Sequence, residues 1–440
     1  MSDQSYSPKN VEELTDCCQC GTCAVICSNI VLKPSDAIMH TDFAPQVKKT
    51  TICDVCNRKR CLAVCPIHEV DKQNSAWLGP DSEIARVRQP VLASAIAHAT
   101  DNDTRTKGAS GGVVSALVTH LLNKEDVNGA MVVRHKKIKS HWGESVLVRN
   151  SSELFNTHSS VYTPVPFNDS LKYCVKNNAF KFAVVGRPCQ LRTLGKIEKL
   201  YPQLRERIVC KIGLFCAWQL SSSALSFLAS MSGKRGDKFE EVRFRHGAWP
   251  GQLVFSTRNK KNVFPFSDLR HSNGTYYYPL SIPYIPQTCS RCVDVLGTCA
   301  DISVGDPWNL GLKTGLGYSM VLIRTNKGMT TWKEASEKEG LIIKDEEISQ
   351  TQFLQSQGTT VELKSSGAFI RGSKCRSIKK DVLRYVKLFR LYDYLINKFK
   401  WRCFQRQCSR IFLLITWSKL RKRIDPSLYC AMRAHKEKSS

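Results

Sequence analysis

Short apolar runs and amphipathic segments alternate along residues 110–325. Residues 110–122 have the three-and-four apolar spacing of a helix and are introduced by glycines. The order of strand followed by helix recurs between residues 182 and 196. This alternation predicts an α/β fold. The expected strands are 130–134, 182–185, 208–214, 241–245, 253–257 and 319–325, and the expected helices are 110–122 and one that starts over 190–196.

The tail of the chain, residues 366–440, has a separate composition. Residues 371–440 hold twenty Lys and Arg against four Asp and Glu, a large share of the net charge of +27. Apolar residues recur at helical spacing through 384–399 with basic residues between them, which predicts a basic amphipathic helix, and 401–423 predicts a second. Such helices bind an anionic membrane surface, where each basic residue adds about 1 kcal/mol, or pack on their own domain or a partner. Nucleic acid is the least favoured partner, because no recognised nucleic-acid motif accompanies the charge.

Two features of the sequence bear on location. No apolar run reaches the ~18 to 20 residues that a membrane-spanning helix needs. Residues 1–10 are polar and lack the pattern of a signal peptide, which favours a reducing compartment. We therefore expect a cytoplasmic protein, held at the inner face of the membrane if the tail binds lipid.

Cysteines are concentrated in two runs near the amino terminus. Nine of the twenty cysteines fall within the first 65 residues. Three thiols at two-residue intervals, with a fourth three residues later, suit a cubane iron–sulfur cluster, because a tight loop can wrap three of its corners. Two such runs predict two 4Fe–4S clusters and therefore electron transfer. The runs are Cys17, Cys20, Cys23 and Cys27, then Cys53, Cys56, Cys61 and Cys65, which Pro66 follows.

Zinc and disulfides are the alternative interpretations of these runs. Structural zinc uses CxxC pairs separated by a longer loop, and a third cysteine two residues later leaves too little chain for tetrahedral closure. Disulfides are disfavoured by the reducing compartment that we expect. Cys18 lies between two expected ligands, and we expect its side chain to point away from them.

A glycine-rich turn precedes the helix near residue 113. Its sequence is Lys107-Gly-Ala-Ser-Gly-Gly-Val113. Glycines at a helix amino terminus let backbone N–H groups approach an anion, and the helix dipole adds to the attraction. The turn therefore suits a flavin or nucleotide phosphate, or equally a purely structural role.

Four further cysteines follow in the central part of the chain. Cys189 and Cys216 each come just after an expected strand, where open α/β sheets bind ligands. Cys289 and Cys292 form a CxxC pair. The four thiols would supply a third cluster; the alternative is that they are buried thiols without metal, which are common in protein cores.

These motifs, taken in order, resemble a known family. The order SGG before a helix, G-x-PCQ, IGLFC, CxxCxD and ADISVGD is similar to the beta subunits of coenzyme F-420 hydrogenase and dehydrogenase, over roughly residues 10–360. The resemblance implies FAD and iron–sulfur clusters. It also implies electron transfer between a deazaflavin or another organic small-molecule substrate and ferredoxin-type carriers.

The amino-terminal runs resemble those of bacterial two-cluster ferredoxins, in which the fourth cysteine of each run ligates the other run's cluster. Two departures are Ser28, where proline is usual, and the four residues 57–60, where two are usual. The longer loop makes Cys61 the least regular ligand. By this resemblance the first set is Cys17, Cys20, Cys23 and Cys65, and the second is Cys53, Cys56, Cys61 and Cys27.

The family resemblance also implies flavin contacts and domain limits. The flavin would lie beside Ser110, Gly111 and Gly112 of the turn, and beside Arg245 and Trp249 in residues 243–251. Three domains are expected: a two-cluster ferredoxin-like module at 1–78, a larger α/β FAD domain at 79–365, and the basic helical tail at 366–440.

The expected activity is that of an oxidoreductase. FAD exchanges electron pairs with an organic substrate, whereas each cluster carries one electron to or from a ferredoxin-type carrier or a redox partner subunit. His246, Asp294 and Asp306 are candidates for acid or base help. Two other hypotheses are a non-catalytic electron-transfer subunit of a larger redox complex, and a scaffold that binds a membrane surface through the tail.

Overall fold

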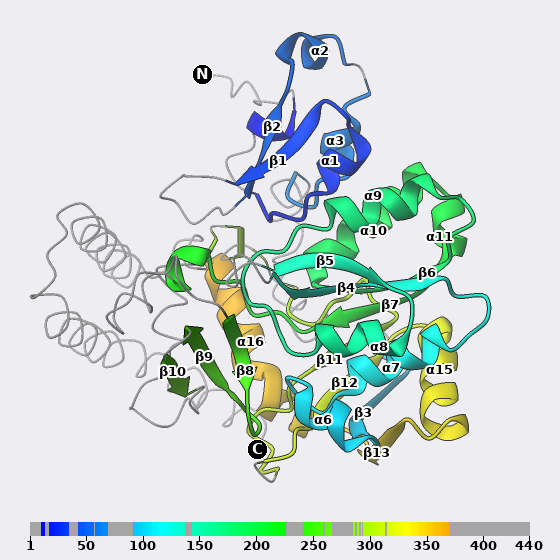
Figure 1. Ribbon diagram of the computed structural model, residues 1–440, viewed down its shortest axis with the longest axis vertical. Helices are drawn as coiled ribbons and strands as arrows, with labels where there is room; N and C mark the ends of the chain where they lie inside the picture. The colour runs from blue at the N-terminus through cyan, green and yellow to red at the C-terminus, as the bar shows by residue number, and fades with distance from the viewer. Residues whose placement is uncertain are drawn as a thin grey trace, which may run out of the picture.

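A mixed sheet forms the centre of the chain in the computed structural model (Figure 1). The structure describes residues 10–13, 17–34, 43–56, 58–68, 91–136, 143–225, 241–257, 260–265, 285–286, 288–289, 292, 294–312 and 315–369. The strands of this sheet are β3 (Ala93–Ala99), β4 (Gly129–His135), β5 (Gly143–Val148), β6 (Phe182–Gly186), β7 (Ile208–Leu214), β11 (Ile302–Gly305), β12 (Ser319–Ile323) and β13 (Ile342–Glu346). Within the described residues they lie in the order β13-β3-β12-β11-β7-β6-β4-β5.

Neighbouring strands at the centre of the sheet run parallel. β11 pairs with β7, β7 with β6, and β6 with β4. Alternate side chains of β6 enter opposite cores: Ala183 and Val185 on one face, Phe182 and Val184 on the other. Both faces are buried, as expected of parallel strands. The carboxyl ends of these strands meet at one edge, where open α/β sheets bind their ligands.

One face of the sheet is covered by α7 (Val113–Leu122) and α15 (Asn326–Lys333). Leu117 and Leu121 form the apolar stripe of α7 and pack in the same core as Trp332 of α15. α15 continues into the π-helical turn η4 (Glu334–Lys338). The short helices on this side are α6 (Asn102–Lys107), α8 (Ser151–Leu154) and η2 (Phe155–Thr157).

The other face is covered by α9 (Asn168–Lys176), α10 (Pro188–Leu200), α11 (Gln203–Arg207) and α16 (Gln350–Phe369). Leu191 and Leu194 of α10 are fully buried and pack against Phe182 of the sheet. Burial of each such side chain contributes about 1.5–3 kcal/mol. Phe353 of α16 packs on the same face against Met320. The result is a three-layer α/β/α arrangement.

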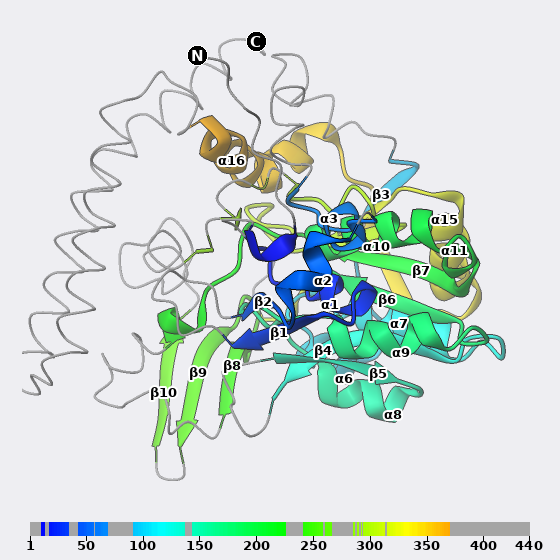
Figure 2. The ribbon, with the colours of Figure 1, turned by 90° about the horizontal axis from the view of Figure 1, so that it is seen from above.

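A small amino-terminal module packs beside α9 and α10 (Figures 1 and 2). The backbone N–H of Phe167 donates to the carbonyl oxygen of Cys20 at 2.8 Å. Thr193 Oγ1 donates to the Val64 carbonyl at 2.6 Å, and Lys196 Nζ to that of Cys65 at 2.6 Å. The module is thus joined to the sheet domain by direct hydrogen bonds. Its elements are η1 (Val11–Glu13), α1 (Thr22–Ile26), β1 (Ile30–Pro34), β2 (Phe43–Val47), α2 (Thr50–Asp54) and α3 (Arg60–Ala63).

A second antiparallel sheet projects from the side of the molecule (Figure 2). It consists of β8 (Glu241–His246), β9 (Gln252–Thr257) and β10 (Lys260–Pro265). Residues 247–251 connect β8 to β9 and contain Trp249. This sheet therefore supplies the second segment that the family resemblance placed beside the flavin.

The expected α/β class is confirmed, and the strand at 208–214 has the expected bounds. The helix expected at 110–122 starts at Val113 instead, because Gly112 has a left-handed backbone and forms the N-cap. α16 continues across the expected domain limit at 365/366. The helices expected at 384–399 and 401–423 lie outside the described residues. Among the described helices, none has the length and apolar character needed to cross a bilayer.

Candidate functional site

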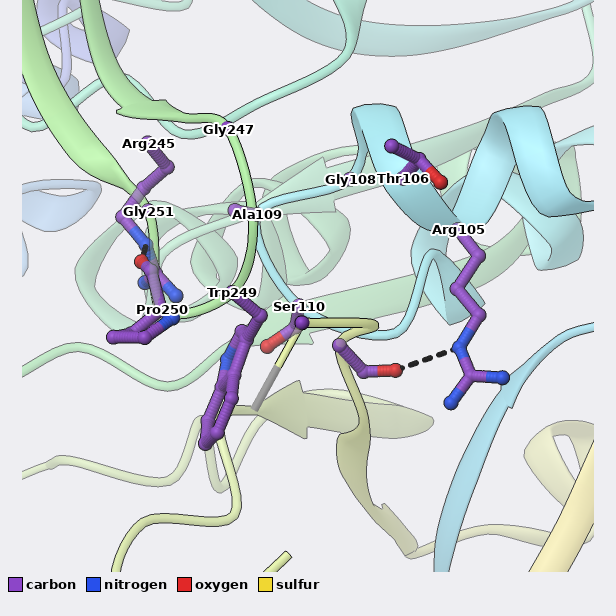
Figure 3. A pocket seen from close by; sticks show the side chains of 12 residues that line it. Arg105, Thr106, Gly108, Ala109, Ser110, Arg245, Gly247, Trp249, Pro250 and Gly251 are labelled. Atoms are coloured by element: carbon purple, nitrogen blue, oxygen red, sulfur yellow. Dashed lines mark hydrogen bonds between the residues drawn. The ribbon is translucent and has the colours of Figure 1, made fainter. Parts of the chain in front are cut away.

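A hollow of about 220 Å³ opens at the carboxyl edge of the central sheet (Figure 3). Three of the residues expected to lie beside the flavin, Ser110, Arg245 and Trp249, line it. Its walls are Arg105, Thr106, Gly108, Ala109, Ser110, Arg245, Gly247, Trp249, Pro250, Gly251, Gly315 and Gly317.

Asp306, just past β11, joins three side chains of this hollow. Ser110 Oγ donates to Asp306 Oδ1 at 2.5 Å, and Trp249 Nε1 donates to the same oxygen at 2.8 Å. Arg245 binds both carboxylate oxygens, through Nη1 at 3.0 Å and Nη2 at 2.9 Å. One carboxylate therefore holds the glycine-rich turn and the 247–251 segment in a fixed relation.

Arg245 is buried, with 5% of its surface exposed. Burial alone would lower the pKa of its guanidinium, but the charge of Asp306 more than offsets this and raises the pKa. Arg245 Nη1 also donates to the Tyr162 hydroxyl at 3.1 Å. The Trp308 ring lies 5.4 Å from the guanidinium and stacks on Trp249 at 5.6 Å. The charge of Arg245 is thus balanced inside the protein, and the two tryptophans present an aromatic surface.

The glycines of the expected phosphate turn have two different roles. A Cβ on Gly111 would lie 2.8 Å from the carbonyl oxygen of Ala97. Gly112 has a φ of +76°, and a Cβ there would lie 2.8 Å from the carbonyl oxygen of Thr104. These two glycines permit close packing of the turn, whereas residues 108–110 line the hollow.

Arg105 also lines the hollow, although no sequence motif singled it out. Its side chain is buried; Nε donates to the Gly317 carbonyl at 2.9 Å, and the guanidinium lies 4.6 Å from the Tyr318 ring. Its buried Nη2 has no hydrogen-bond partner within the described residues. An unsatisfied buried donor costs about 1–3 kcal/mol, so this nitrogen is suited to an anionic acceptor such as a phosphate oxygen. Arg105 differs from the nearby Lys107 in being buried. The sequence does not reveal this burial, so it could not single out Arg105.

The first expected set of cysteines lies together in the amino-terminal module. Burial and the nearby charge of Cys20 raise the pKa of Cys17, and the charge of Cys65 adds to this effect. Burial and the same neighbouring thiolates also raise the pKa of Cys23. Thr22 Oγ1 donates to Cys20 Sγ at 3.3 Å. The thiols that the ferredoxin resemblance assigned to one cluster therefore converge.

The second set lies at the outer end of the module. Burial raises the pKa of Cys61, and the charges of Cys27 and Cys53 add to the effect. Asn29 Nδ2 donates to Cys53 Sγ at 3.5 Å, and Cys56 is exposed. The two sets are neighbours, because one apolar cluster contains members of both. Those members are Cys23, Cys27, Cys61 and Cys65.

The central cysteines gather around two arginines at the carboxyl ends of β6 and β7. Gly186 lies beside Gly213 in these strands, so the residues that follow them start at the same edge. Cys216 N–H donates to the Val295 carbonyl at 2.8 Å, which brings the CxxC segment there. Burial alone would lower the pKa of Arg187, but the thiolates around it raise the pKa instead. The thiolates that act on Arg187 are Cys189, Cys216, Cys289 and Cys18. The pKa of Arg192 is raised chiefly by the charge of Asp294, and then by Cys292, Cys299 and Cys189.

We expected the Cys18 side chain to point away from the neighbouring cluster ligands, and this prediction is wrong. Its side chain is buried between the two groups, because the sheet domain packs against this side of the module. A hydrogen bond with Cys189 raises the pKa of Cys18, and a hydrogen bond with Cys18 lowers the pKa of Cys20 to about 7. Cys18 thus connects the first amino-terminal set to Cys189.

The donor sets fit iron–sulfur clusters by their chemistry. All of the described cysteines are free thiols. In the part of the chain that the structure describes, no three His, Cys, Asp or Glu side chains lie close enough to bind a single metal ion. A cubane instead takes one thiolate at each of its separated corners, and hydrogen bonds to the sulfurs tune it. The two amino-terminal sets would each hold one cluster, and Cys189, Cys216, Cys289 and Cys292 would hold a third.

Asp294 and Asp306 both have structural contacts. Asp294 is buried and accepts from the Gly297 N–H at 2.9 Å, from Thr298 Oγ1 at 3.0 Å and from Arg192 at 3.3 Å. Such contacts are those of a carboxylate that closes a loop. The acid or base role of Asp294 and Asp306 stays a prediction. The same is true of His246, which is the last residue of β8.

Comparison with known proteins identifies relatives for most of this architecture. The sequence profile of the coenzyme F420 hydrogenase/dehydrogenase beta subunit amino terminus matches residues 94–172, and that of its carboxyl terminus matches residues 180–349. The F420-dependent sulfite reductase of Methanocaldococcus jannaschii is 26% identical over 77% of this chain and 48% of the relative. The beta subunit of F420-dependent formate dehydrogenase from the same organism is 30% identical over 56% of this chain and 59% of the relative.

A solved structure of the F420-reducing [NiFe] hydrogenase complex from Methanosarcina barkeri has a chain that is 18% identical, with a TM-score of 0.48, over 66% of this chain and 94% of that chain. The present chain spans about half the length of the sulfite reductase that it matches. Both profiles match in order, and together they cover more than half of the residues. The chain therefore belongs to the coenzyme F420 hydrogenase/dehydrogenase beta subunit family.

Proposed function

We propose that this chain is an iron–sulfur flavoprotein oxidoreductase that moves electrons between a one-electron carrier and an organic substrate. One observation carries the proposal. The cysteines form a continuous series from the exposed Cys56, through the two sets of the module and Cys18, to Cys189 and Cys216 at the carboxyl edge of the sheet. The hollow with its aromatic surface lies at that same edge.

The residues of the hollow fit one end of a flavin nucleotide. FAD, when bound, exchanges electron pairs with an organic substrate and single electrons with clusters. Arg105 would neutralise a phosphate, and the backbone N–H groups of Ala109 and Ser110 would donate to it. Trp249 would contact the ring system. Asp306 would keep Trp249 and Ser110 in register by the hydrogen bonds described above.

The organic substrate that we propose is a deazaflavin. The relatives are named as F420-dependent enzymes or as subunits of them, and this chain shares their family. A deazaflavin accepts a hydride, which is the two-electron chemistry that a bound flavin would supply.

Metal and flavin analysis tests the proposal directly. Protein purified without oxygen should contain roughly eight irons, matching sulfide and one flavin per chain, or roughly twelve irons if the Cys189 group also holds a cluster. Reduced protein should then bleach an oxidised deazaflavin in proportion to its flavin content. Zinc in place of iron, with no flavin, would overturn the proposal.

A non-catalytic electron-transfer subunit is the second candidate. It is favoured by the naming of several relatives as beta subunits of hydrogenases and formate dehydrogenases. The two candidates differ in what purified chain can do alone. Flavin and iron with no deazaflavin turnover, restored by a copurifying partner, would favour the subunit.

A further inference from the structure

The outer end of the amino-terminal module exposes apolar side chains beside an expected cluster ligand. Helix α2 lies at the end of the module that faces away from the central sheet (Figure 1). Val55 is 76% exposed and Ile52 is 47% exposed; Cys53 lies between them in the sequence, and the exposed Cys56 follows Val55. Single exposed apolar residues are ordinary, but here two of them surround a thiol assigned to electron transfer.

Basic residues stand on both sides of these apolar residues in the sequence. The segment from residue 48 to residue 60 contains five basic residues and a single acidic one, Asp54. All five basic residues are exposed. A positive rim around a small apolar centre is complementary to an acidic protein and speeds its encounter. The basic residues are Lys48, Lys49, Arg58, Lys59 and Arg60.

This surface is also where a partner comes nearest to the buried cysteines. Cys53 and the exposed Cys56 of the second set lie within it, and Cys61 of that set shares an apolar cluster with Cys65 of the first. Cys18 and Cys189 lie farther in, against the sheet domain. Among the described cysteines of the series, Cys56 is the exposed one, so the outer end of the module is the exposed end of the series.

We propose that residues 48–56 and 58–60 form the docking surface for an acidic one-electron carrier protein. This inference rests on the proposed function, because it assumes that the second cysteine set takes part in electron transfer. A small patch with a charged rim is typical of transient redox encounters, which bury less than about 1,200 Å². At each encounter the carrier is oxidised by one electron and this protein is reduced by one, or the reverse; no bond forms or breaks and no proton moves.

Charge reversal tests the docking surface. The probe is an acidic plant-type [2Fe–2S] ferredoxin, and the variant is Lys49→Glu with Arg58→Glu in the anaerobically purified full chain. Calorimetric titration should show binding weakened about tenfold or more at low salt, because two attractive rim charges become repulsive. The difference from the unmodified protein should shrink at high ionic strength, where such charges are screened.

Two further variants keep the test specific. Lys333→Glu with Lys338→Glu makes the same change of charge on exposed residues of α15 and η4, far from α2 in Figure 1. Ferredoxin binding should be unchanged in this control. Val55→Ser removes apolar contact without changing charge, so binding should weaken while its salt dependence stays the same.

The outcomes separate the docking proposal from the proposed function. Iron content and the extent of reduction by dithionite are measured on every variant. If the unmodified chain holds no iron, the proposed function fails. If it holds iron and is reduced by dithionite, but the Lys49 and Arg58 variant binds ferredoxin as tightly as the control does, the docking proposal is wrong. It is also wrong if the variant loses only binding to anionic vesicles.

Discussion

Arg105 is the residue that we propose binds the phosphate of a flavin in the hollow. Its Nη2 is buried and has no partner among the described residues, whereas Arg245 is paired with Asp306. Arg105→Ala should therefore reduce the flavin that copurifies with the chain several-fold or more. Flavin absorbance per chain after denaturation provides the measurement.

Two variants control for this loss. Arg105→Lys keeps the charge but not the fork of donors, so flavin content should fall less. Arg134→Ala removes an exposed arginine paired with Glu144 and should leave flavin content unchanged. Normal flavin in the Arg105→Ala protein would contradict the phosphate role.

Asp306 is expected to matter for stability as well as for the site. Asp306→Asn would leave the buried guanidinium of Arg245 without its counter-charge. Loss of one partner of a buried pair costs about 3–5 kcal/mol. Denaturant unfolding should show a loss of this size. Asp126→Asn, which breaks the exposed pair with Lys181, should cost less than about 1 kcal/mol, and equal losses in the two variants would refute the argument.

Sequence could predict the site residues that belong to recognisable motifs. Ser110, Arg245 and Trp249 were expected beside one another and do line the same hollow. Arg105 was not expected to line the hollow. An arginine close before a glycine-rich turn is ordinary in sequence, and only the structure shows that it is buried. Cys18 was misjudged for the same reason, since what encloses it comes from another domain.

Among the elements, the turn before α7 is sensitive to substitution. Gly112 has a left-handed backbone, and a Cβ there would lie 2.8 Å from the Thr104 carbonyl. Gly112→Ala should lower the free energy of unfolding by about 1–2 kcal/mol or more. A Cβ added at Gly195 in α10 would have no neighbouring atom within 4 Å. Gly195→Ala should therefore raise the free energy of unfolding by about 0.5–1 kcal/mol. The denaturant midpoint should therefore fall for Gly112→Ala and rise for Gly195→Ala. A change in the same direction for both variants would contradict this account.

The strands and helices with large apolar residues were predictable, and those without were not. β7 has the expected bounds because Ile208, Ile212 and Leu214 give a clear pattern. β3 was missed, since Ala93–Ala99 consists mostly of small residues. Its place is set by pairing with β12 and β13 on either side, which is tertiary information.

For the whole molecule, the tail carries a prediction that its composition alone supports. We propose that the tail binds anionic membrane surfaces, because its basic residues alternate with apolar ones at helical spacing. Liposomes with anionic lipid should recover the full chain but not a chain that ends at Gly372. Equal recovery of both proteins would refute the proposal. Neutral liposomes and unchanged iron content of the shortened chain serve as controls.

The direct hydrogen bonds between the module and the sheet domain have a kinetic consequence. Phe167 binds Cys20 through the backbone, while Thr193 and Lys196 bind the carbonyls of Val64 and Cys65, next to the cysteines themselves. The spacing between the module, where we propose the clusters, and the sheet domain, where we propose the flavin, is therefore set by hydrogen-bonded secondary structure. Internal electron transfer should proceed at the same rate in buffer and in viscous sucrose solution, whereas delivery by an external carrier should slow as diffusion slows. A flash-reduction experiment in the two solvents would separate these steps, and a viscosity-dependent internal step would mean that the module swings on its domain.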